Sequence, residues 1–120
     1  MSQDATLFSD SLDAETILSL KELDKPDLID LVETFLKHSK ERMRVLKQAI
    51  LDLNIGEVQM ASHSMKGGGS TIGAIKFANI CARLEAMAKA GSLNGAENIF
   101  NELEIEYDKA SHALRTELIG

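Results

Sequence analysis

One histidine in this chain stands among residues that suit a nucleophilic site. It opens the stretch His63–Ser70, which reads HSMKGGGS. If this stretch is helical, the residues three and four positions later share the face of the histidine, and these are Lys66 and Gly67. An imidazole can act as a nucleophile, and here it would have an ammonium group on one side and bare backbone on the other. The spacing therefore predicts one candidate site, built around His63.

The three consecutive glycines need an explanation, because each glycine inside a helix costs about 1 kcal/mol relative to alanine. Gly67 could clear space beside the imidazole for a bulky group or a partner. Gly68 and Gly69 could let a neighbouring helix come close, or the helix could break in a flexible Gly-Ser loop. A phosphate-binding loop is poorly supported, because such a loop follows a strand and its lysine comes after the glycines.

The remaining residues with reactive side chains form no comparable constellation. His38 and His112 have no second ligand at metal-binding spacing, so the sequence predicts no metal site. Cys81 falls on an apolar helical stripe, which favours a small core residue over a reactive thiolate.

The elements that would position His63 are helices, because apolar residues recur every three or four positions and no sustained alternation marks a strand. A short helix capped by Ser11 or Asp13 is expected first, followed by a long helix with Pro26 in its first turn that continues to about Leu53. A third helix carries His63 and ends at Gly73. The fourth ends at Gly91, and the fifth covers about 96–118, with Glu102, Glu104 and Glu106 on a solvated side. These lengths predict an all-α fold: an antiparallel up-down four-helix bundle with a short additional N-terminal helix.

Length and charge limit the function classes. The 120 residues fit a polar N-terminal tail (1–10) and a single helical bundle domain (11–120). The net charge of -6 argues against nucleic acid and an anionic membrane surface as partners. The single cysteine, and the lack of a long apolar run or an export signal, lead us to expect a cytoplasmic protein. No surface stripe calls for a dimer, so we expect a monomer.

The extended motif resembles a known family. HSMKGGGSTIGA, followed by CARLEAMAKAG, is similar to the histidine-containing phosphotransfer (HPt) domain of multistep two-component phosphorelays. The matching positions run through the third helix and a Leu-Glu pair on the fourth: His63, Met65, Lys66, Gly67, Gly68, Gly69, Gly73, Leu84 and Glu85. Ser62 and Met65 replace the more usual Ala and Leu, and neither change removes a phosphotransfer group. The resemblance extends from about Leu12 onward.

This resemblance implies a role for each residue of the site. His63 would be the phosphoacceptor, Lys66 would offset the charge on the phosphoryl oxygens, and Gly67 would leave room for in-line approach. Glu85 could accept a hydrogen bond from the Nδ1–H group of His63, and Lys89 could add positive potential. Partner docking is expected at Met60, Ser70, Ile17 and Leu18.

The resemblance also implies partners and excludes a cofactor on this chain. We expect a phosphotransfer carrier without kinase activity of its own. Its partners would be receiver domains of response regulators and of a hybrid sensor histidine kinase, and the Mg²⁺ ion would belong to the receiver. Two alternatives stay open: a helical, lactose-type IIA phosphocarrier of the sugar phosphotransferase system, or a bundle that binds receivers without accepting phosphate. The Lys-Gly pair after the histidine argues against the first, and His63 itself argues against the second.

Overall fold

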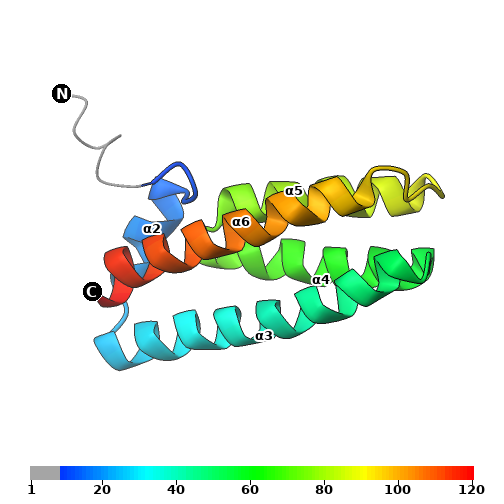
Figure 1. Cartoon of the computed structure of the whole chain (residues 1–120). Helices are drawn as coiled ribbons and strands as arrows, with labels where there is room; N and C mark the ends of the chain where they lie inside the picture. Colours follow the sequence, from blue (N-terminus) through cyan, green and yellow to red (C-terminus); the bar gives the residue numbers. More distant parts are fainter. Residues whose placement is uncertain (1–8) are drawn as a thin grey trace.

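The computed structural model describes residues 9–120, and in this range the chain forms helices joined by short turns, with no strand (Figure 1). The predicted tail falls mostly on residues 1–8, which lie outside the described residues. The elements in chain order are α2 (Ala14–Leu20), α3 (Lys25–Leu51), α4 (Ile55–Ile72), α5 (Ile75–Lys89), α6 (Ala96–Leu114) and a short π-helical segment, η1 (Arg115–Ile119).

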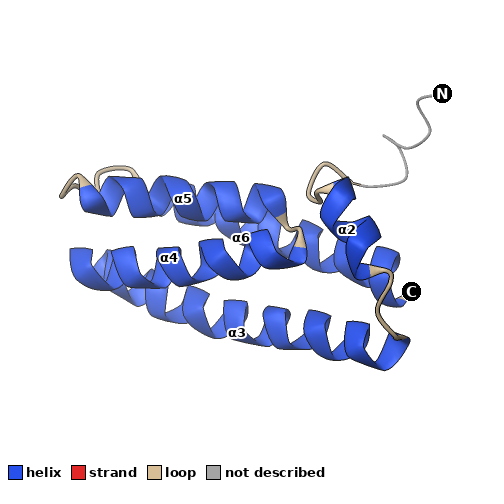
Figure 2. Ribbon diagram, turned by 180° about the vertical axis from the view of Figure 1, so that it is seen from behind, coloured by secondary structure: helices blue, strands red, loops and turns tan. Residues whose placement is uncertain are grey.

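The four long helices run up and down alongside one another, and α2 lies across one end of the bundle, near the C-terminus (Figures 1 and 2). Seen from the side shown in Figure 2, α4 and α5 lie next to each other, with α3 beside α4. The predicted fold class, an all-α bundle with a short N-terminal helix, is confirmed. No helix within residues 9–120 is long and apolar enough to cross a membrane.

Local capping explains where the helices begin and end. Asp13 caps α2 by accepting a hydrogen bond from the Thr16 backbone N–H at 3.2 Å, and Pro26 occupies the first turn of α3, as predicted. The Asn54 side chain caps α4 in the same way. Gly73 ends α4 in the left-handed conformation, with φ of +85°, which a side chain would disfavour.

The core lies between the four long helices and centres on aromatic rings. Phe77 of α5 meets Phe35 of α3 edge to face, with ring centroids 5.6 Å apart, and the ring centroid of Tyr107 of α6 lies 6.3 Å from that of Phe77. The Tyr107 hydroxyl donates a hydrogen bond of 2.8 Å to the Leu36 carbonyl, which ties α6 to α3. These contacts tie α3, α5 and α6 together and so position α5, which carries Glu85. The helix that carries His63, α4, packs against both α5 and α3.

Three details of the predicted elements are wrong, whereas the predicted end of the fourth helix is confirmed. α3 ends at Leu51, and Leu53, predicted on its apolar face, is exposed in the following turn. α5 ends at Lys89, and Gly91 just beyond it is left-handed, with φ of +79°, as expected for a glycine that closes the helix. The α-helical geometry of α6 stops at Leu114, because the next turn widens into the π-helical segment. Glu106, predicted to be solvated, is buried, and its Oε2 atom has no hydrogen-bond partner.

Candidate functional site

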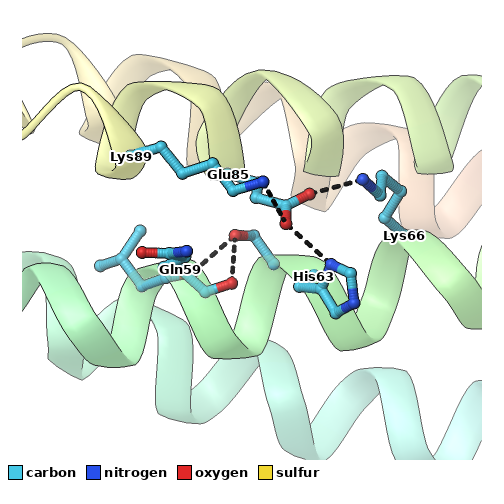
Figure 3. A network of polar contacts seen from close by, with 7 residues as sticks. Gln59, His63, Lys66, Glu85 and Lys89 are labelled. Carbon is cyan, nitrogen blue, oxygen red and sulfur yellow. Dashed lines mark hydrogen bonds and ion pairs between the residues drawn. The ribbon is translucent and has the colours of Figure 1, made fainter.

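His63 lies on the outer face of α4, and 68% of its side chain is exposed. Its Nδ1 atom is 2.7 Å from Oε2 of Glu85, which comes from the adjacent helix α5 (Figure 3). The apolar side of α4, formed by Val58, Met65 and Ile72, points into the core and turns the histidine outward. The predicted pairing between these two residues is therefore present in the structure.

Glu85 joins three groups that the sequence predicted for the site. Its buried carboxylate contacts Nζ of Lys66 at 2.6 Å and Nζ of Lys89 at 3.4 Å, in addition to His63 (Figure 3). The hydrogen bond from Lys66 is the main reason that the pKa of Glu85 falls to about 2; burial opposes this shift, and the contact with His63 supports it. At neutral pH the group is therefore an ionised acceptor.

An ionised carboxylate beside Nδ1 decides which tautomer of a neutral imidazole is favoured. A carboxylate can only accept a hydrogen bond, so Nδ1 must carry the proton and donate it. The lone pair of the neutral ring then lies on Nε2, the other ring nitrogen. The arrangement presents a nucleophilic nitrogen on an exposed side chain. Lys66 and Lys89 are linked to the imidazole through Glu85, which contacts all three side chains.

The glycine run forms unbroken helix, so the predicted loop is not present. A Cβ atom on Gly67 would meet no atom within 4 Å, whereas one on Gly69 would lie 3.1 Å from Phe77 and 3.3 Å from Ala78. Gly69 thus allows α5 to pack closely, as predicted. Gly68 is less constrained, because its added Cβ would make only ordinary contact with Phe35, at 3.7 Å. Nothing within the described chain requires a glycine at position 67.

The predicted docking residues divide into exposed and buried ones. Met60 lies one turn before His63 with 74% of its surface exposed, Leu18 of α2 is 57% exposed, and Ser70 is also exposed. The prediction for Ile17 is wrong, because this residue has no exposed surface. It packs against the turn at Gly73 and is the buried anchor of α2, so it cannot contact a partner directly.

The other reactive residues are not brought together. No group of three or more histidine, cysteine, aspartate or glutamate side chains within residues 9–120 is arranged to hold a metal ion. Cys81 is buried, and burial raises the pKa of its thiol to about 12, so it is a core residue, as predicted. Ser62, an unusual residue for the motif, is buried and donates a hydrogen bond of 2.6 Å to the Val58 carbonyl.

One contact beside the site involves a residue that sequence reasoning did not identify. Arg42 of α3 donates a hydrogen bond from Nε to Oγ of Ser64, the residue after His63, at 3.0 Å. The signal for Arg42 was available: residues 37–47 hold five of the 13 basic residues in the chain and only one acidic residue. The packing of α3 against α4 decides which of these cations lies near the site, and the sequence alone does not show that packing.

Comparisons with known proteins agree with the fold. The family model described as "Hpt domain" matches residues 30–113. The chain is similar to histidine-containing phosphotransfer protein B (HptB) from Pseudomonas aeruginosa PAO1, with 30% identity over 91% of this chain and 95% of that chain, and a TM-score of 0.85. It also has the fold of the histidine-containing phosphotransfer protein MtHPt2 from Medicago truncatula, with 22% identity over 89% and 76% of the two chains and a TM-score of 0.78. No curated protein sequence matches the chain.

Proposed function

Because the chain belongs to the Hpt domain family, whose role is phosphotransfer in phosphorelays, we propose that His63 is its phosphoacceptor. In this proposal His63 takes a phosphoryl group from the aspartyl phosphate of one receiver domain and passes it to an aspartate of another. The observation that carries the proposal is the contact of His63 Nδ1 with Glu85, which leaves Nε2 on an exposed side chain.

The transfer step follows from the tautomer. The Nε2 lone pair forms a bond to phosphorus while the bond from phosphorus to the aspartyl oxygen breaks, and the aspartate leaves as a carboxylate. The imidazole ring becomes positively charged and keeps its proton on Nδ1. Glu85 offsets this charge through its hydrogen bond, so no separate base is required. Passing the phosphoryl group onward is the same step in reverse, with a new aspartate as the nucleophile.

The neighbours of His63 have supporting roles in this scheme. An ammonium group has three N–H donors, so Lys66 can keep its contact with Glu85 and still donate to a phosphoryl oxygen. Lys89 adds positive charge to the same face. Gly67 leaves open space beside the imidazole for the approaching phosphoryl group and the receiver surface.

The partner completes the active site. We propose that the receiver supplies the Mg²⁺ ion and the acidic pocket, and that this chain holds no cofactor. The exposed apolar side chains of Met60 and Leu18 provide a surface on which receivers of response regulators and of a hybrid sensor kinase could dock.

The test is transfer of radiolabelled phosphate from phosphorylated receiver domains in the presence of Mg²⁺. We expect an acid-labile, base-stable label on the wild-type chain and none on His63→Gln. The matched controls are His38→Gln and His112→Gln, which remove the other histidines and should be labelled normally. Binding of a receiver without any label would instead favour the bundle that only binds receivers. Label that persists in His63→Gln would assign the phosphoacceptor to another residue.

A further inference from the structure

The groove between α3 and α4 is crossed by the hydrogen bond from Arg42 to Ser64, the residue after His63. On one side of the bond between Arg42 and Ser64 lies a hollow of about 310 Å³, lined by residues that include Phe35, Gly67 and Thr71. A hollow of about 290 Å³ that includes Met60 lies on the other side. Arg42 and Ser64 line both hollows, so they form a bridge between the open surface at Gly67 and the exposed apolar surface at Met60.

Arg42 also differs from the other cations near His63 in its charge environment. Lys66 and Lys89 both contact the carboxylate of Glu85, which offsets part of their charge. Arg44, two residues further along α3, pairs with Glu41 at 2.5 Å. Arg42 forms no ion pair with any carboxylate in the described part of the chain, although it lies on the surface. Glu41 beside it feels its positive charge and Glu57 lines the same hollow, but neither forms an ion pair with Arg42, so its Nη donors are available to an acidic partner.

The contact with Ser64 holds the guanidinium group in a defined direction. Arginine has five N–H donors in one plane, and only the Nε–H donor is used by Ser64. The four N–H donors on the two Nη atoms remain, and they form the fork that binds a carboxylate in a bidentate manner. Because the bond to Ser64 favours one orientation of this plane, less conformational entropy is lost when a partner binds.

We propose that Arg42 of α3, oriented by Ser64, binds a carboxylate of the receiver near its phosphoacceptor pocket. This inference rests on the proposed function, because it specifies how the same partner is recognised. Arg42 acts in docking and Ser64 acts through Arg42. Neither residue takes part in the transfer of the phosphoryl group.

The experiment measures transfer and binding separately. A panel of purified receiver domains, phosphorylated with acetyl phosphate, is mixed with increasing concentrations of each variant, which gives a maximal rate and a half-saturating concentration. Binding of the same receivers, activated with beryllofluoride, is measured by fluorescence anisotropy and needs no transfer. The matched control is Arg44→Ala, which removes the same charge from the same helix.

For Arg42→Ala we expect the half-saturating concentration and the dissociation constant to rise roughly fivefold, with an unchanged maximal rate and a weaker dependence on salt. Ser64→Ala should raise both about twofold in the wild type but have no effect in the Arg42→Ala background, because Ser64 acts only through Arg42. Arg42→Lys should fall between Arg42→Ala and the wild type. Arg44→Ala should leave both constants unchanged.

Three results would overturn the inference. Unchanged constants in Arg42→Ala would show that Arg42 does not contribute to receiver binding, and a reduced maximal rate alone would place Arg42 in the chemical step. An equal loss of affinity in Arg44→Ala would show that only the net charge of α3 matters, and not the position of Arg42. Failure of the proposed function looks different: receivers would bind without labelling His63, in which case the anisotropy series still tests Arg42. If no receiver bound the wild type at all, both proposals would fall.

Discussion

Replacing each of the three consecutive glycines with alanine should give three different changes in stability. All three occupy the interior of α4, so each substitution gains the same helix propensity, about 1 kcal/mol. What differs is the space for the new methyl group. Position 67 is open, position 68 offers ordinary contact with Phe35 at 3.7 Å, and position 69 lies 3.1 Å from Phe77.

The expected magnitudes follow from these distances. Gly67→Ala and Gly68→Ala should each stabilise the fold by up to about 1 kcal/mol. In Gly69→Ala the methyl group meets the Phe77 ring, the Ala74 carbonyl and the Ala78 side chain, and such overpacking typically costs about 1–3 kcal/mol. The net change for Gly69→Ala is then about 0–2 kcal/mol of destabilisation. For 120 residues, 1 kcal/mol corresponds to roughly 4 °C in the midpoint of thermal unfolding.

Thermal unfolding followed by circular dichroism tests this series, and urea unfolding gives the free energies of unfolding directly. We expect the midpoints to rise by up to about 4 °C for the first two variants and to fall by up to about 8 °C for Gly69→Ala. The three variants are controls for one another because they share one helix and one substitution. If Gly69→Ala were as stable as Gly67→Ala, the assignment of close packing to position 69 would be refuted.

Four further predictions concern the site and the core. Lys66→Ala should keep its fold and transfer phosphate about tenfold more slowly, in a rapid-quench assay, because one charge-assisted donor is lost; an unchanged rate would remove Lys66 from the site. Gly67→Gln should block labelling by the receiver while remaining folded, since no atom of the chain lies near its Cβ, and normal labelling would show that the open space is unimportant. The Glu85 carboxyl should titrate by NMR near pH 2, below its usual value of 4.5. The stability it contributes is then present above about pH 4.5 and disappears as the pH falls through about 2, so the difference in unfolding midpoint between wild type and Glu85→Gln should shrink on acidification; a titration near 4.5 would contradict the ion-pair network. Cys81 should react with iodoacetamide at pH 8 only after unfolding in urea, and rapid labelling of the native protein would contradict its burial.

Features that depend on neighbouring residues in the chain were the most predictable from sequence. The cap at Asp13, the proline in the first turn of α3 and the glycine that ends α4 all act within one turn, so residue type and position sufficed. The outward direction of His63 followed from the apolar periodicity of α4. The role of Glu85 could be predicted only from its place in a known motif, because nothing in its local sequence shows that it faces another helix.

Errors arose where packing between helices decides the outcome. Ile17 and Leu18 are adjacent and equally apolar, and only the position of α2 against Gly73 decides which of them is buried. Glu106 was expected in water because carboxylates seldom lose their hydration, yet α6 buries it. Arg42 was overlooked because its contact with Ser64 joins residues 22 positions apart.

The left-handed turn at Gly73 has a consequence for how partners are recognised. The Gly73 carbonyl accepts a hydrogen bond of 2.8 Å from the backbone N–H of Asp13, and the turn packs against Thr16 and Ile17, so α2 is fastened to the end of the helix that carries His63. We therefore expect Leu18 and the imidazole to keep their relative positions when a partner binds. A protein with such a preformed surface presents the same shape to every receiver. Differences in affinity among receivers would then depend mainly on the surface residues of the receivers.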